Sequence, residues 1–115
     1  MSKIPRVLNA RRDIIPPDAI WVDRKTKWGN PFKMGHDPSV GGYTREQCIQ
    51  LHEHFLFTTP AGQLLLNSLF ELTGHDLICW CAPLPCHADI LLILANPTMF
   101  PDRYRELFLK SHSNK

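Results

Sequence analysis

The feature that most constrains the fold is a long apolar stretch in the second half of the chain, divided by Pro83 and Pro85. Before the prolines, Leu77-Ile78-Cys79-Trp80-Cys81 has the length of a buried strand. After them, Cys86–Ala95 has the length of a helix, which Asn96-Pro97 ends. An apolar strand that leads through a turn into an apolar helix predicts a fold of the α/β class.

The rest of the chain supplies further predicted elements. These are strands over residues 6–11 and 19–24, helices over 44–57 and 61–72, and an amphipathic segment over 101–110. Two helices between the second and third strands fit a crossover that joins parallel strands. We therefore expect one Rossmann-like α/β domain over residues 1–110. Its mostly parallel sheet has three or more strands flanked by helices in two or three layers, and residues 111–115 form a frayed tail.

Composition limits the class of protein. The chain has 115 residues, 21% of them charged, and a formal net charge of +2. This length suits one domain, and the composition excludes a disordered chain or a coiled coil. No apolar run approaches the ~18 residues that a membrane-spanning helix needs, and the N-terminus lacks the apolar core of a signal peptide. We therefore expect a cytoplasmic protein without a membrane partner.

Charge is distributed unevenly. Residues 1–33 contain eight Lys or Arg and three Asp, a net charge of +5, so the remainder carries −3. The isoelectric point of 8.4 lies below the value of about 9 typical of dedicated DNA-binding domains. The charge distribution still allows a local basic site that binds a phosphate group. For most of these side chains, a solvated surface is the simpler interpretation.

Three of the four cysteines, Cys79, Cys81 and Cys86, fall within eight residues. Alternation along a strand would point Cys79 and Cys81 to the same face. Cys86 and His87 would then begin the next helix, beyond the carboxyl end of the strand, where ligands of open α/β sheets gather. Because the start of a helix favours an anion, we expect a lowered pKa for the Cys86 thiol if it is exposed.

Two functional interpretations of this cluster stay open. In the first, Cys81, Cys86 and His87 bind zinc, with Cys79 or a more distant side chain such as His75 or Asp89 completing the set. The spacing differs from that of paired zinc-finger ligands, and adjacent Cys86 and His87 would be strained on one ion. In the second, Cys86 is an activated thiolate with His87 or Asp89 as its partner.

A structural interpretation competes with both. Free cysteine is often a small buried residue, and we favour this role for Cys48 and Cys79. Zinc nucleobase deaminases are excluded, because the second cysteine of their Pro-Cys-x-x-Cys motif is missing after Cys86. His52 and His54 are two apart on a helix, point to different sides and are expected at the surface. Dinucleotide-binding glycine motifs and phosphate-binding Walker loops are absent.

A second candidate site is the loop Lys27-Trp28-Gly29-Asn30-Pro31-Phe32, which follows the second predicted strand. Arg24 and Lys27 are suited to hold a phosphate, Trp28 to stack on a base or sugar, and Asn30 to read a hydrogen-bonding edge. Alternatively, the Asn-Pro pair makes a turn, and Trp28 and Phe32 cap the core. If this loop and the cysteine cluster share one edge of the sheet, they form a single pocket.

Together these two motifs resemble a widespread uncharacterised family, domain of unknown function 4326. The resemblance lies in Lys27-Trp28-Gly29-Asn30-Pro31-Phe32 and in Cys79-Trp80-Cys81-Ala82-Pro83-Leu84-Pro85-Cys86-His87, and it extends over about residues 6–96. Members often carry Gly in place of Ala88 and a Gly-Arg pair in place of Asp23-Arg24. The resemblance implies a compact α/β domain and brings no established reaction.

The leading functional hypothesis is a pocket for a nucleotide or another phosphate-bearing small molecule. Its expected residues are Arg24, Lys27, Trp28, Gly29, Asn30, Cys81, Cys86 and His87. If the protein is an enzyme, transfer or hydrolysis at a nucleotide or glycosidic bond is the expected class, with Cys86 or Asp89 as nucleophile or base. The alternative is a non-enzymatic interaction protein, with or without structural zinc, such as a phage-type modulator of a host protein.

Overall fold

Three short parallel strands form the sheet of the computed structural model, which describes residues 4–23, 25–32, 43–82, 84 and 86–113. The strands are β1 (Val7–Asn9), β2 (Ile20–Trp21) and β3 (Leu77–Cys79), in the spatial order β1-β3-β2. Leu77 pairs with Val7 on one side and with Ile20 on the other. The central strand β3 is entirely buried, as expected for a parallel strand covered by other elements.

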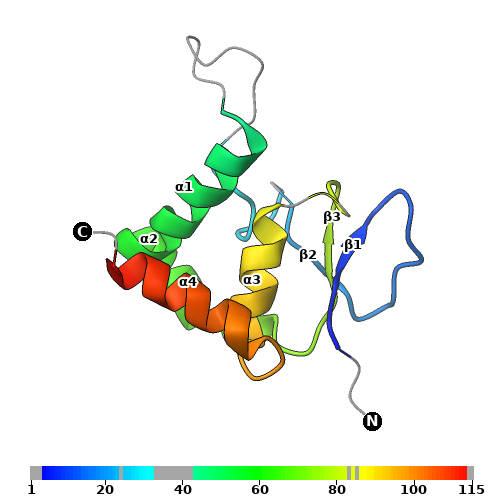
Figure 1. The fold of residues 1–115 in the computed structure, drawn as a ribbon. Helices are drawn as coiled ribbons and strands as arrows, with labels where there is room; N and C mark the ends of the chain where they lie inside the picture. The colour runs from blue at the N-terminus through cyan, green and yellow to red at the C-terminus, as the bar shows by residue number, and fades with distance from the viewer. Residues whose placement is uncertain (1–3, 24, 33–42, 83, 85, 114–115) are drawn as a thin grey trace.

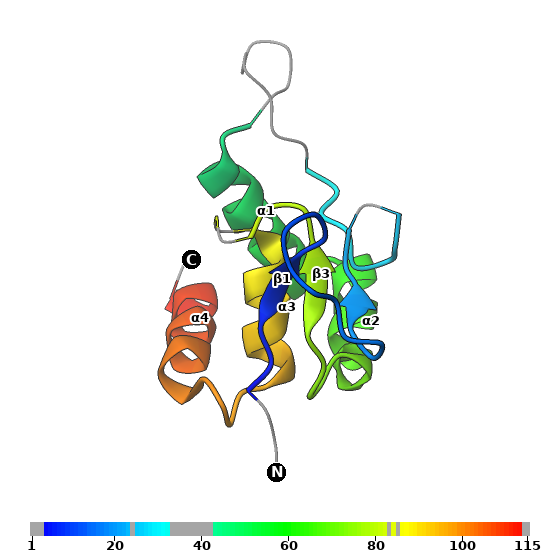
Figure 2. The same cartoon turned by 90° about the vertical axis from the view of Figure 1, so that its right-hand side faces the viewer.

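Among the described residues, four α-helices and one short 3₁₀-helix complete the domain (Figure 1). They are α1 (Arg45–Thr58), α2 (Pro60–Asn67), the 3₁₀-helix η2 (Leu69–Glu71), α3 (His87–Ala95) and α4 (Pro101–Ser113). The crossover from β2 to β3 runs through α1, α2 and η2. Figures 1 and 2 show the helices on one side of the sheet, so the fold has two layers.

Helix α3 lies at the centre of the packing. Seven of its nine residues are buried, because it contacts the sheet on one side and α1 and α4 on others. A helix that is apolar all round is suited to such a position. Fully buried Leu91 joins Leu77 of β3 and Leu56 of α1 in the core.

Local sequence sets the helix boundaries. The Thr44 side chain accepts a hydrogen bond from the Gln47 amide, and the Gln47 side chain bonds back to the Thr44 amide, which starts α1. At the start of α2 the Thr59 side chain accepts a hydrogen bond from the Gly62 amide, and Pro60 stands at the first helical position. Gly74 adopts a φ of 80°, which ends the helical region before β3.

The predicted α/β class and parallel sheet are confirmed, with differences at the ends of elements. The helix predicted over residues 61–72 is interrupted at Ser68, where the hydroxyl bonds to the Leu64 carbonyl and the backbone leaves helical geometry. Helix α4 continues to Ser113, three residues into the segment predicted as a tail. The glycine-rich segment 35–42 and residues 114–115 lie outside the described residues. No helix in the described ranges is long and apolar enough to span a membrane.

Candidate ligand-binding pocket

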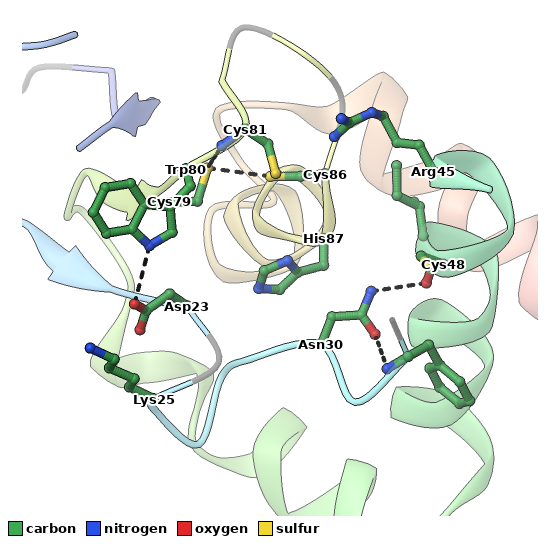
Figure 3. Close-up of a pocket in the computed structure, with 12 residues that line it drawn as sticks. Asp23, Lys25, Asn30, Arg45, Cys48, Cys79, Trp80, Cys81, Cys86 and His87 are labelled. Atoms are coloured by element: carbon green, nitrogen blue, oxygen red, sulfur yellow. Dashed lines mark hydrogen bonds between the residues drawn. The ribbon is translucent and has the colours of Figure 1, made fainter. Parts of the chain in front are cut away.

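A pocket of about 400 Å³ opens at the carboxyl ends of β2 and β3, beside the start of α3 (Figure 3). Its lining residues are Asp23, Lys25, Asn30, Phe32, Arg45, Cys48, Ile49, Cys79, Trp80, Cys81, Cys86 and His87. They come from the two strand ends, the loop after β2, the first turn of α1 and the first residues of α3. This edge is where ligands of open α/β sheets bind.

The structure brings together part of the predicted site. Asn30 from the loop after β2 lines the same pocket as Cys81, Cys86 and His87 from the junction between β3 and α3. Lys27, Trp28, Gly29 and Asp89 are not among the lining residues. Arg24 lies outside the described residues.

Two neighbouring thiols, those of Cys79 and Cys86, line the pocket. The Sγ atoms of Cys79 and Cys86 lie 3.5 Å apart, and the Cys81 amide donates a hydrogen bond to the Cys79 Sγ at 3.4 Å. The bond from Cys86 lowers the pKa of Cys79 to about 6, although burial partly opposes this shift. The same bond, together with burial, raises the pKa of Cys86. Both thiols are buried, and the hydrogen bond between them lowers the pKa of Cys79, not that of Cys86.

The side chains of Cys86 and Asp89 cap the first turn of α3. The Cys86 side chain accepts a hydrogen bond from the Asp89 amide, and Asp89 Oδ2 accepts one from the Cys86 amide at 2.9 Å. This reciprocal pair has the geometry of a capping box with sulfur in place of a hydroxyl. Cys86 and Asp89 therefore both contribute to the start of the helix that carries His87.

His87 is held in one tautomer. Its Nε2 lies 2.6 Å from the Val22 carbonyl oxygen, which only accepts hydrogen bonds. Nε2 must therefore carry the proton, and Nδ1 is the acceptor atom of the neutral ring. The half-buried His87 ring thus has a fixed orientation in the pocket wall.

Asn30 and Trp28 have structural contacts. The Asn30 Nδ2 donates to the Cys48 carbonyl at 3.0 Å, and its Oδ1 accepts from the Phe32 amide at 3.0 Å, which ties the loop to α1. Trp28 is 3% exposed and belongs to the core, as in the core-capping interpretation. The Lys27 Nζ lies 2.9 Å from a Glu71 carboxylate oxygen and 5.2 Å from the Trp28 ring centroid.

Other pocket residues were not among the predicted site residues. Exposed Lys25 and half-buried Arg45 supply positive charge from opposite sides of the pocket, as Figure 3 shows. The exposed Trp80 forms part of the wall, and its Nε1–H donates to Asp23 Oδ2 at 3.4 Å. The Thr44 capping box predicts that a helix begins at Arg45, but it does not predict which way this end faces.

Asn9 shapes the wall that carries the cysteines. Its buried Nδ2 donates to the carbonyls of Trp80 at 3.2 Å and Ala82 at 2.8 Å. These bonds and the Cys79 thiol turn the chain away from the sheet, so β3 ends at Cys79. The prediction that Cys79 and Cys81 share the face of a continuing strand is therefore wrong.

In the part of the chain that the structure describes, no group of three or more His, Cys, Asp or Glu is placed to hold a metal ion. The predicted set of Cys81, Cys86 and His87 therefore does not converge on one point. His75, considered as a further ligand, has its Nδ1 2.8 Å from the Asp18 carbonyl oxygen.

The expected surface position of His52 is also wrong, whereas His54 is exposed as predicted. Helix α1 packs on α3, and this contact makes His52 fully buried, with its ring 5.2 Å from that of His87. Neither ring nitrogen of His52 has a hydrogen-bond partner among the described residues. Burial, and to a smaller extent His87, lowers the pKa of His52 to about 3, so its ring is neutral.

Comparison of the sequence with protein-family models identifies the family of this chain. The model of a family described as a domain of unknown function (DUF4326) matches residues 7–97. The chain belongs to the DUF4326 family. The match includes the three strands and the whole β3–α3 junction of this DUF4326 domain.

A curated relative of this DUF4326 protein is an uncharacterized 12.4 kDa protein in the nrdA-td intergenic region of Enterobacteria phage T4. The two are 33% identical over 85 residues, which cover 73% of this chain and 72% of the relative. No solved structure matches the chain.

Proposed function

We propose that the pocket binds a nucleotide or another phosphate-bearing nucleoside derivative. Its volume of about 400 Å³ falls within the range of roughly 300–1,000 Å³ found for small-molecule sites. Its position outside the carboxyl ends of parallel strands, at the start of a helix, supports the same proposal.

The observation that carries the proposal is the distribution of side-chain types in the pocket. Lys25 and Arg45 supply the positive charge that a phosphate needs, and Arg45 can donate two hydrogen bonds to it. Trp80 and Phe32 supply aromatic surface for a base or sugar. In this proposal Lys25 binds the phosphate and Trp80 stacks on the base or sugar, the functions that were predicted for Lys27 and Trp28.

The proposal includes transfer or hydrolysis on the bound ligand. His87 is the proposed proton acceptor in such a step, because its ring lines the pocket and its contact with the Val22 carbonyl fixes the ring orientation. The attacking water or hydroxyl oxygen would bond to the reacting phosphorus or sugar carbon while the bond from that atom to the leaving group breaks. The proton of the attacking group would pass to His87 and then to the leaving group. Cys86 and Asp89 assist by holding the first turn of α3, which fixes the backbone of His87.

Calorimetric titration of the protein with purine and pyrimidine nucleoside monophosphates tests this proposal. We expect saturable binding to one site per chain, weakened about 10-fold or more in Arg45→Ala, since a charge-assisted hydrogen bond contributes about 1.5–3 kcal/mol. Arg103→Ala, which removes an exposed arginine from α4, is the matched control and should bind as the wild type does. Equal affinity in Arg45→Ala and the wild type would contradict the proposed site.

A second candidate function, a protein-binding module, has one specific observation in its favour. Leu64 of α2 is 69% exposed and Phe70 of η2 is 75% exposed, neither of them in the pocket lining. Exposed apolar side chains of this size are common at protein interfaces. A retained nucleotide affinity in a Leu64→Glu, Phe70→Glu variant would show that this surface and the pocket are separate.

A further inference from the structure

We propose that the ligand is a nucleotide within a single-stranded nucleic acid, and that Trp21 and Trp80 form a shelf on which the neighbouring base stacks. This inference rests on the proposed function, because it places one nucleotide of the strand in the pocket. It adds the class of substrate and a second contact surface outside the pocket.

The shelf is a pair of exposed indole rings. Trp21 of β2 is 41% exposed and Trp80, which follows β3, is 50% exposed. Their ring centroids lie 5.7 Å apart with an angle of 46° between the planes. Large aromatic side chains at the surface leave apolar ring area in water, and a base has a flat π-face that covers such area regardless of sequence.

The shelf is continuous with the pocket. Trp80 is a member of both, since it lines the cavity and packs against Trp21, whereas Trp21 does not line the cavity. Two contacts hold Trp80 in place: its indole N–H donates to Asp23, and its carbonyl accepts from the Asn9 side chain. A nucleotide in the pocket would therefore have its neighbour in the strand beside a fixed aromatic surface.

The charge beside the shelf favours a polyanion over an apolar peptide. The guanidinium carbon of Arg11 lies 5.5 Å from the centre of the Trp80 ring. Arg11 and Arg12 are exposed directly after β1, at the same edge of the sheet as exposed Lys25 after β2. The nearby Asp13 carboxylate accepts the Asn9 amide at 2.7 Å. Cations beside exposed aromatic rings, on which bases can stack, are the combination that binds single strands.

A single strand fits better than a duplex. Bases in a duplex stack on one another, so their faces are not available to a tryptophan, whereas the bases of a single strand are. The isoelectric point of 8.4 agrees with contact to few phosphates and not with the long basic surface of a duplex-binding domain.

The test compares a short oligothymidylate, a short oligoadenylate and the corresponding mononucleotides by tryptophan fluorescence quenching. We expect each oligonucleotide to bind about 10-fold tighter than its mononucleotide, in line with the contribution of one stacked base. Trp21→Ala should remove this difference and leave mononucleotide affinity unchanged, because Trp21 lies outside the pocket lining. Trp21→Phe should keep most of the difference, and Phe70→Ala, an exposed aromatic residue elsewhere, should keep all of it.

The outcomes separate the two proposals. Equal affinity for oligonucleotides and mononucleotides, or an unchanged difference in Trp21→Ala, would overturn the shelf and leave the nucleotide pocket standing. Duplex binding as tight as single-strand binding would also overturn the shelf. Failure of every mononucleotide to bind would overturn the pocket itself. Thermal melting of each variant establishes that it is folded.

Discussion

The Sγ atoms of Cys79 and Cys86 lie 3.5 Å apart, at the point where the central strand and the start of α3 meet. Cys79 is the last residue of β3, and Cys86 is the residue that caps α3. The bond between them joins the two ends of the junction whose residues line one part of the pocket. The four cysteines of this chain all line the same cavity.

The first prediction concerns the titration of this pair. One thiol should ionise with a pKa of about 6, and we expect it to be Cys79, with Cys86 as the donor in the bond between them. Cys86→Ala removes the donor and should raise the pKa of Cys79, whereas Cys86→Ser keeps a hydroxyl donor and should preserve much of the shift. Thiolate absorbance as a function of pH measures this. If Cys79→Ala still shows a thiolate titration near pH 6, the pKa belongs to another group and the assignment to Cys79 is wrong.

The same shift predicts how stability depends on pH. The pKa of Cys79 is lowered from 9.0 to about 6 on folding, so between these values the unfolded chain binds more protons than the folded one. The contribution of Cys79 to the free energy of unfolding should therefore rise between about pH 6 and about pH 9 and be lost as pH falls through about 6. Urea unfolding across this range, in the wild type and in Cys79→Ala, measures the difference.

His52 predicts a separate sensitivity to acid. Its pKa falls from 6.5 to about 3 on folding, mainly because the ring is buried. Below pH 6.5 the His52 ring is protonated in the unfolded chain but stays neutral in the folded chain. The free energy of unfolding should therefore fall by up to about 1.4 kcal/mol for each unit by which the pH is lowered toward 3. His52→Leu should reduce this slope, whereas substitution of the exposed His54 should not. A wild-type slope retained in His52→Leu would contradict the account.

Asn9 should be essential to the shape of the pocket wall. Asn9→Asp replaces the amide that donates to the Trp80 and Ala82 carbonyls with a carboxylate that only accepts. We expect a loss of about 2–3 kcal/mol in the free energy of unfolding, since a buried bond to the Ala82 carbonyl and a part-buried bond to the Trp80 carbonyl lose their donor. Substitution of the exposed Asn67 to Asp is the control. Equal stability of the two variants would show that the Asn9 bonds contribute little.

Two glycines should differ in their tolerance of alanine. A Cβ at Gly62 would lie 2.6 Å from the Leu56 Cα and closer still to the Phe55 carbonyl oxygen, so α1 and α2 would have to move apart. Gly74 has open space around it, and alanine there meets only the strain of a φ of 80°, about 1–2 kcal/mol. Gly62→Ala should therefore lower the melting temperature more than Gly74→Ala. The reverse order would contradict the packing of α1 on α2.

Local patterns in the sequence predict much of this fold. The prolines between Cys81 and Cys86 separate two apolar runs, and this division places a strand before the turn and a helix after it. The Thr44 and Gln47 pair predicts the start of α1, because both halves of the capping box lie within four residues. These features depend on neighbours in the chain, so they can be recognised without the fold.

The candidate site depends on contacts between distant segments and was predicted only in part. Trp28 follows the polar residues Lys25, Thr26 and Lys27, whereas Trp80 lies in an apolar run, yet Trp28 is folded into the core and Trp80 is at the surface. His52 is buried because α3 packs against its side of α1, which helical spacing alone does not indicate. Arg45 reaches the pocket because of the direction of α1, which is set by the crossover from β2 to β3.

The central claim is that a nucleotide occupies the pocket at the carboxyl edge of the sheet, and nuclear magnetic resonance titration with a nucleoside monophosphate tests it most directly. The account predicts saturable shifts of the His87 ring, the Trp80 indole N–H and the Arg45 side chain, with one ligand per chain. The buried Trp28 indole serves as an internal reference and should shift little. Saturable shifts confined to other parts of the molecule, or no shifts at millimolar nucleotide, would contradict the account.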